Sequence, residues 1–303
     1  MINKKLISVR MRIAVLLLAL LLVIGVSGTV AWFASSSESK MNDIKMQSTS
    51  RLLKVEFRGN DKGHWIDKYL DSAIHSDAEV WLVSEDADFN NKTNEQGEGQ
   101  GLEPGSAGML EFRVVPSENL GSVRVDLIYS IRGIRETVDE NRENPVLSEI
   151  TEEALLQYLN AHIMLFEKYD EATGKYEGLI ENQTDGSGQI TLNRIVENKT
   201  YLKDNTEYTQ VYWIWPAYLK NIISTNEGEL LYEVSERDNV IDYIVKNKSG
   251  FFKDLNITDD ELKRELTAYD HYGTYSIKFD EADLVIGSQV RYAILGMTVE
   301  EEE

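Results

Sequence analysis

The chain of 303 residues contains no cysteine. A protein without cysteine forms no disulfide and has no thiolate for nucleophilic catalysis. If the chain is exported, as its N-terminal residues indicate below, its stability therefore depends on a hydrophobic core. Apolar residues make up 42% of the sequence, which is sufficient for such a core and argues against a disordered chain.

Motifs of metal and nucleophilic catalysis are also missing. The four histidines, His64, His75, His162 and His271, form no HExxH pair, and the spacing of His64 and His75 fits no standard zinc pattern. The segment 186–188, Gly-Ser-Gly, is too short for a GxSxG nucleophile elbow. We therefore predict that the protein is not an enzyme and has no catalytic residue, cofactor or metal ligand. His162 is interpreted as a half-buried histidine at the start of a strand.

Basic residues are outnumbered by acidic ones, 31 against 52, and the formal net charge is −21. Such a surface repels nucleic acid and anionic lipid, and it leaves contacts through cations open. Glu85, Asp86, Asp88 and Asn90 offer oxygen ligands at alternating spacing, as calcium loops do. The glycine and the distant glutamate of such loops are not in register, so a solvated acidic loop is the prediction and a weak calcium site is the alternative.

The longest apolar run lies at residues 13–33, after four basic residues among the first twelve. Residues 13–26 carry no charge and have the length of a signal-peptide core, short of the ~20 apolar residues of a spanning helix. Thr29 and Ala31 place small side chains three and one before a bond that a signal peptidase would cut. We predict a signal peptide over 1–31, cleaved between Ala31 and Trp32. An uncleaved anchor, counted on through residue 34, is the alternative.

Apolar residues alternate with polar ones in most of the remaining chain, which is typical of strands with one buried face. Strands are predicted over 51–58, 78–84, 109–115, 122–131, 162–169, 175–180, 189–195, 207–215, 275–279 and 289–299. The strands 109–115 and 122–131 are expected to pair as a hairpin. The first of them follows a turn at 103–106, Glu-Pro-Gly-Ser, where proline and glycine occupy the central positions.

Helical spacing of apolar residues predicts helices over 148–161, 217–223, 235–247 and 258–269. The last begins with Thr258 and Glu261 at the spacing of a capping box. Strands at both ends with helices between them predict a mainly β fold, an antiparallel jelly-roll-like β-sandwich with a helical insertion at about 135–272. The domain is expected to span 51–303, after a leader or donor strand at 32–50, and residues 300–303 are interpreted as an acidic tail.

Three stretches carry a resemblance to a known family. They are the junction 28–33, Gly-Thr-Val-Ala-Trp-Phe; the strand start 102–108, Leu-Glu-Pro-Gly-Ser-Ala-Gly; and 282–287, Ala-Asp-Leu-Val-Ile-Gly, followed by Tyr292. They resemble the TasA and camelysin family of exported Gram-positive proteins, especially its large clostridial-type members. Residues 34–37 depart from the Asp-containing turn of that family, and no motif covers 135–272.

The resemblance implies a jelly-roll subunit of biofilm-matrix fibres, processed by a dedicated signal peptidase of the SipW, endoplasmic-reticulum-like type. We accordingly predict a secreted structural subunit of an extracellular matrix or surface fibre, which self-associates and binds no nucleic acid. The segment 32–50 is predicted to complete the sheet of a neighbouring subunit. The alternative is that it pairs within its own subunit or stays disordered.

The alternative function is a monomeric cell-surface module that binds a glycan or a host protein through Trp213 and Trp215. In a strand, however, one of the pairs 212/214 and 213/215 must face inward, so a core with an exposed edge competes with this interpretation. Asn-x-Ser/Thr sequons are interpreted as polar loops; they begin at Asn91, Asn182, Asn198, Asn247 and Asn256.

Overall fold

The structure is a computed structural model that describes residues 53–58, 77–82, 102–116, 121–137, 146–184, 189–204, 207–268 and 273–301. All of them belong to one compact unit, Leu52–Glu303. The predicted cleavage site between Ala31 and Trp32, the segment 32–50, the acidic loop from Glu85 to Asn90, and three of the histidines, His64, His75 and His271, lie outside the described residues. Within the described ranges, none of the helices combines the length and the hydrophobicity that crossing a bilayer requires.

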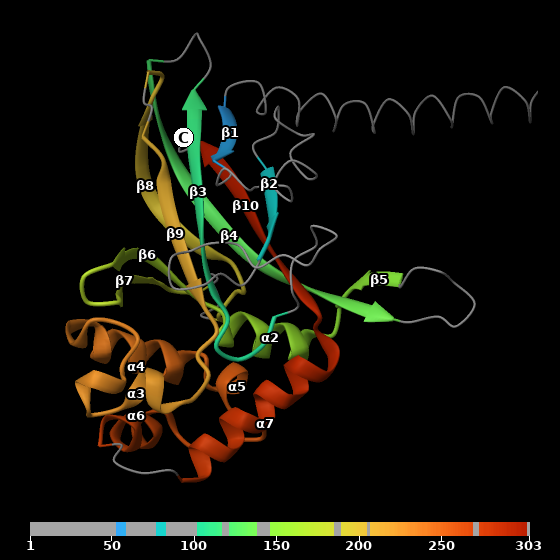
Figure 1. The fold of residues 1–303 in the computed structure, drawn as a ribbon, viewed down its shortest axis with the longest axis vertical. Coiled ribbons are helices and arrows are strands. Elements are labelled where there is room, and N and C mark those ends of the chain that lie inside the picture. The colour runs from blue at the N-terminus through green and yellow to red at the C-terminus, as the bar shows by residue number, and fades with distance from the viewer. Residues whose placement is uncertain are drawn as a thin grey trace, which may run out of the picture. The chain divides into compact units, whose positions relative to one another are not determined.

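Two antiparallel five-stranded sheets form the larger part of the unit, as the alternation predicts (Figure 1). The first sheet has the order β1 (Leu53–Arg58), β3 (Ala107–Pro116), β9 (Thr209–Ile214), β6 (Met164–Asp170) and β7 (Lys175–Ile180). The second has the order β2 (Asp77–Trp81), β10 (Tyr292–Glu301), β4 (Ser122–Thr137) and β5 (Val146–Glu149), with β8 (Arg194–Leu202) also paired to β4. The mainly β, antiparallel prediction is therefore confirmed.

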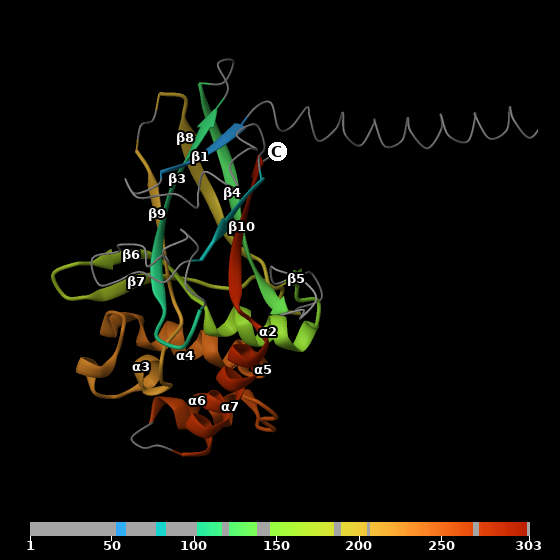
Figure 2. The same ribbon diagram turned by 45° about the vertical axis from the view of Figure 1, so that its right-hand side comes forward.

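The helices gather at one end of the long strands β3, β4, β9 and β10, as both views show (Figures 1 and 2). They are α2 (Glu153–His162), α3 (Lys220–Ile223), α4 (Arg237–Lys246), α5 (Lys248–Phe251), α6 (Asp259–Thr267) and α7 (Thr274–Gln289), with short 3-10 turns η1 (Glu227–Glu229) and η2 (Val234–Glu236). The Thr258 hydroxyl accepts a hydrogen bond from the Glu261 amide at 3.4 Å, which confirms the predicted cap of α6. Strands β6 to β9 lie within the 135–272 range, and α7 lies beyond it.

The predicted hairpin of β3 and β4 is wrong. β3 pairs with β1 and β9, whereas β4 pairs with β10 from Ile134↔Tyr292 to Val125↔Glu301. The two strands meet through their faces, because the Phe112 ring contacts the Tyr129 ring edge-on with centroids 6.4 Å apart. Alternation identifies the buried face of a strand and carries no information about its partner, so neighbours in sequence can belong to different sheets.

The strand predicted at 275–279 is also wrong, because these residues begin α7. Phe279, Ala282, Asp283 and Ile286 are its buried residues, and their spacing of three and four is that of one helix face. The apolar residues at 275, 277 and 279 alternate by coincidence within that longer helical pattern. β10 consequently starts at Tyr292 and continues into the predicted acidic tail, as far as Glu301. β8 also begins later than its prediction, at Arg194.

Strand β9 is covered on both faces. Trp213 and Trp215 belong to a hydrophobic cluster to which both sheets contribute, whereas Tyr212 and Ile214 belong to a second cluster formed mainly with the helices. We call these the sheet cluster and the helix cluster. The first sheet therefore buries apolar residues on both sides where the helices cover it, and this determines which side chains can reach the surface.

The predicted turn before β3 is confirmed. The Ser106 amide donates to the Glu103 carbonyl at 2.9 Å, and Gly105 has a φ of +95°, which favours glycine. Gly108 is required for a different reason: a Cβ atom there would lie 2.7 Å from Nε1 of Trp213. The glycines of the 102–108 motif thus allow one tight turn and one close contact with a buried indole.

Candidate functional site

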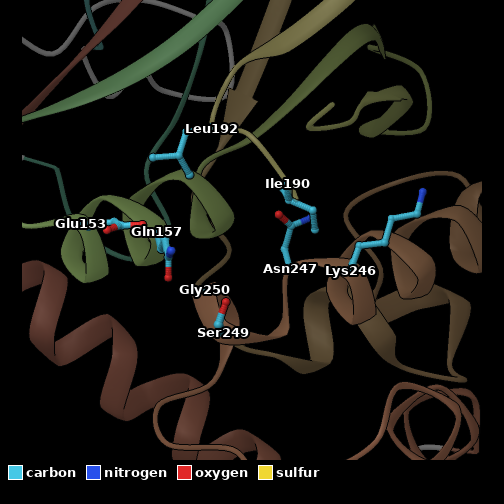
Figure 3. A pocket seen from close by; sticks show the side chains of 8 residues that line it. All are labelled: Glu153, Gln157, Ile190, Leu192, Lys246, Asn247, Ser249 and Gly250. Carbon is cyan, nitrogen blue, oxygen red and sulfur yellow. The ribbon is translucent and has the colours of Figure 1, made fainter. Parts of the chain in front are cut away.

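A small cavity of about 110 Å³ lies between α2, the segment before β8 and the junction of α4 with α5 (Figure 3). Its lining combines carboxylate, amide, ammonium and hydroxyl groups with two aliphatic side chains: Glu153, Gln157, Ile190, Leu192, Lys246, Asn247, Ser249 and Gly250. Ligand pockets usually enclose about 300–1,000 Å³, so this volume suits a few water molecules rather than a substrate.

At Gly250, which lines the cavity, α5 approaches α2 very closely. A Cβ atom on Gly250 would lie 2.6 Å from both Cβ of Ala161 and the carbonyl oxygen of Gln157. Such distances are far below van der Waals contact, so the chain has glycine here for reasons of space.

Two of the polar groups in the lining are engaged by other parts of the protein. Lys246 forms an ion pair with Glu181 at 2.7 Å, and Asn247 accepts a hydrogen bond from Asn182 at 2.7 Å. The Asn247 side chain also donates to the carbonyl of Tyr243 at 2.9 Å. These bonds tie the cavity wall to a buried polar network behind it.

Arg194, at the start of β8, is the centre of that network and is only 1% exposed. Its Nε donates to Asn182 at 2.8 Å, and its Nη2 donates to the carbonyls of Asn160 and Ile163, the latter at 2.7 Å. Nη2 also lies 3.1 Å from the hydroxyl of Tyr243 on α4. One side chain thus joins β8, the segment after β7, the end of α2 and α4.

The electrostatic partner of Arg194 is a helix end rather than a carboxylate. No ion pair connects it with an acidic side chain in the described ranges, and burial lowers the pKa of its guanidinium. The carbonyls of Asn160 and Ile163 belong to the C-terminal end of α2, where the helix dipole is negative. A positive charge at this end stabilises α2. Neutral acceptors satisfy Nε and Nη2 of Arg194, whereas its buried Nη1 has no hydrogen-bond partner among the described residues.

A second buried polar cluster joins His162, Asp283 and Trp215. The indole Nε1 of Trp215 donates to Oδ1 of Asp283 at 2.6 Å, and Nε2 of His162 lies 3.5 Å from the same oxygen. His162 is completely buried, not half-buried at a strand as predicted, and it ends α2. Burial raises the pKa of Asp283 to about 7 and lowers that of His162 to about 4.

Trp213 and Trp215, which the alternative function requires at the surface, are each only 1% exposed. The expectation of a core with an exposed edge is also incorrect, since Tyr212 and Ile214 on the other face are buried as well. This segment offers no aromatic face to a glycan.

The sequons divide into two groups. Asn182 and Asn247 are buried and bond to each other in the Arg194 network, so they are structural residues rather than loop positions. Asn256 is exposed, and Asn198 lies at an irregularity in the pairing of β8 with β4, with a φ of +60°. Asn91 lies outside the described residues.

The sequence carries little sign of either polar cluster. Arg194, Asn182 and Asn247 are common polar residues in polar surroundings. His162 and Asp283 come from distant helices, and the sequence pattern predicts a strand over residues 275–279 of the second. Within the described ranges, no three His, Asp or Glu side chains are grouped as a metal ion requires. Comparisons with protein-family models, curated proteins and solved structures found no match.

Proposed function

We propose that the protein is a secreted structural subunit of an extracellular matrix or surface fibre, built as a jelly-roll-like β-sandwich with helices at one end. The observation that carries the proposal is the position of β1 and β2. Each is the outermost strand of its sheet, and no other strand in the described ranges pairs with its outer side. An unpaired strand edge is a template for a strand from another chain.

The opposite edge of the first sheet is partly closed. Tyr176 of β7 donates to the carbonyl of Leu231 at 3.0 Å and accepts from the amide of Glu233 at 3.0 Å. The backbone N–H and C=O groups of Tyr176 on that side are therefore already used by the chain itself. In the first sheet this asymmetry favours growth through the edge of β1 and supports a head-to-tail contact, which produces fibres when it does not close.

Filament formation tests the proposal directly. Purified protein that begins at Trp32 should form filaments whose length increases with time in electron micrographs. Removal of residues 32–46 should abolish the filaments and leave a monomer with an unchanged cooperative melt, because an extended strand donor adds backbone hydrogen bonds at a neighbour's edge. Removal of the polar residues 35–38 alone, which retains the apolar side chains, serves as the control and should preserve assembly. Persistent monomers of the protein that begins at Trp32 would contradict the proposal.

The processing site makes a separate prediction. Replacement of Ala31 by Phe should leave the precursor in the membrane, because a signal peptidase accepts only a small side chain next to the cleaved bond. The matched change Ala34→Phe, three residues beyond that bond, should leave cleavage intact. N-terminal sequencing of the secreted protein checks both, and a mature protein that starts elsewhere than Trp32 contradicts the assignment.

A further inference from the structure

The His162–Asp283 contact lies where the two hydrophobic clusters meet. Trp215 belongs to the sheet cluster, whereas the His162 ring packs on Phe251 and Phe279 of the helix cluster, with centroids 5.4 and 4.6 Å away. Asp283 lies between them on α7 and is 7% exposed. The polar contact therefore joins α2 and the end of β9 to α7.

The hydrogen bonds determine which ring nitrogen of His162 carries the proton. Nδ1 lies 2.9 Å from the carbonyl oxygen of Tyr158, and a carbonyl can only accept, so Nδ1 donates. Nε2 consequently has a free lone pair in the neutral ring, and it has no hydrogen-bond partner among the described residues. The polar side-chain atom that faces it is Oδ1 of Asp283 at 3.5 Å.

Few other charged groups face this pair. On α7, Asp280 lies one turn before Asp283 and its charge disfavours ionisation of Asp283. From α5, the Gly250 carbonyl favours a proton on His162, while Lys248 binds the Ile257 carbonyl and Asp259 instead. Trp215, the residue directly after β9, contributes its indole, which does not titrate in this range.

Burial restricts the charge states of such a pair. The protons that matter are those on Nε2 of His162 and on the Asp283 carboxylate. If both sites were protonated, a buried imidazolium would lack a counterion; if neither were, a buried carboxylate would face the lone pair of Nε2. With one proton the pair is neutral as a whole, either as a carboxyl that donates to Nε2 or as an imidazolium facing a carboxylate. This proton also gives Nε2 of His162, which otherwise has no hydrogen-bond partner among the described residues, an interaction with the Asp283 carboxylate.

We propose that His162 and Asp283 hold one proton between them in the folded protein from about pH 4 to pH 7 and thereby keep the junction of α2 with α7 almost equally stable across that range. This proton exchanges with the solvent and is bound either to a carboxylate oxygen of Asp283 or to Nε2 of His162. The inference concerns a single subunit and does not depend on fibre assembly.

Linkage gives the sign of each contribution. Asp283, with its pKa raised from 3.8 to about 7, stabilises the fold fully below pH 3.8, and this contribution is lost as the pH rises through 7. His162, with its pKa lowered from 6.5 to about 4, stabilises the fold fully above pH 6.5, and this contribution is lost as the pH falls through 4. The two windows almost coincide and the signs are opposite, so the pH dependences largely cancel.

Hydrogen exchange of the α7 amides in the full chain, corrected for intrinsic rates, tests the proposal. Between pH 7 and pH 4 the opening equilibrium of the wild-type helix should change less than about fivefold. Asp283→Asn retains an oxygen for Trp215 and supplies an N–H to His162, so only the histidine contribution remains. Opening of α7 should then increase about 100-fold over the same range. His162→Gln should show a change of about 100-fold or more in the opposite direction.

Glu281→Gln is the matched control, because it removes an exposed carboxylate from the same helix and should retain the weak pH dependence of the wild type. NMR of the wild-type protein gives a second measurement that needs no variant to fold. The Asp283 carboxyl carbon should titrate near pH 7, and the His162 ring should show no separate protonation near pH 6.5. An acid-induced opening of the wild type as steep as that of Asp283→Asn, or a His162 ring that takes up a proton of its own near pH 6.5, would overturn the proposal.

Discussion

Replacement of Arg194 by methionine should lower the free energy of unfolding by about 3 kcal/mol. Methionine fills much of the same volume and relieves the cost of a buried charge, which by itself would favour the variant. It also leaves the Ile163 carbonyl and the Asn182 side chain without the donor that Arg194 supplies, and each such loss costs about 1–3 kcal/mol. The interaction with the end of α2 is lost as well, so we expect the destabilising effects to prevail.

Chemical unfolding measures this difference through the shift of the midpoint at constant slope. The matched control is Arg264→Met, in which the same change is made on α6 at a side chain that is 71% exposed. Its ion pairs at 3.8 Å with Glu261 and Glu265 are solvent-exposed, and the expected effect is within about 0.5 kcal/mol of zero. A stability of Arg194→Met equal to the wild type would mean that the cost of the buried charge fully offsets the bonds it makes.

Gly250→Ala should destabilise the protein by about 2–4 kcal/mol. The added methyl group would lie 2.6 Å from the Gln157 carbonyl and from Cβ of Ala161, so α5 has to move away from α2. Because Gly250 lines the cavity and its neighbour Phe251 packs on His162, this shift should also disturb the junction with α7. Thermal and chemical unfolding would both detect the loss.

Gly287→Ala provides a control with the opposite expected sign. Gly287 lies on the exposed face of α7, and a Cβ atom there would meet nothing within 4 Å. Alanine has a higher helix propensity than glycine, so this variant should gain about 0.5–1 kcal/mol. If both alanine variants changed stability in the same direction, the close approach of α5 to α2 would not be what requires Gly250.

The sequence pattern correctly predicted secondary structure where the conformation of a residue depends on its neighbours in the same segment. β1, β3, β4, β6, β7 and β9 lie where alternation predicts strands, and α4 and α6 lie where helical spacing predicts helices. The turn at 103–106 and the Thr258 cap are likewise decided within a few residues, by the φ preference of glycine and by one hydroxyl. Pattern failed over 275–279, because five residues fit both periods and only the longer helix distinguishes them.

The candidate polar clusters could not be predicted in the same way. Their residues come from separate elements: Arg194 from β8, Asn182 from the segment after β7 and Tyr243 from α4. A sequence records that these side chains are polar, and it does not record that α2 ends beside them. The sequons at Asn182 and Asn247 show the consequence, since two positions with the pattern of polar loops are buried and bonded to each other.

The sequence by itself determined that the described chain forms mainly antiparallel sheets with helices, and where most of those elements lie, because the period of apolar residues and the chemistry of turns and caps act locally. Only the tertiary structure decided that β3 and β4 belong to different sheets, that both faces of β9 are buried, and that His162 meets Asp283. Strand partners and buried polar contacts depend on how distant surfaces fit together in three dimensions. The resulting burial raises the pKa of Asp283 and lowers the pKa of His162.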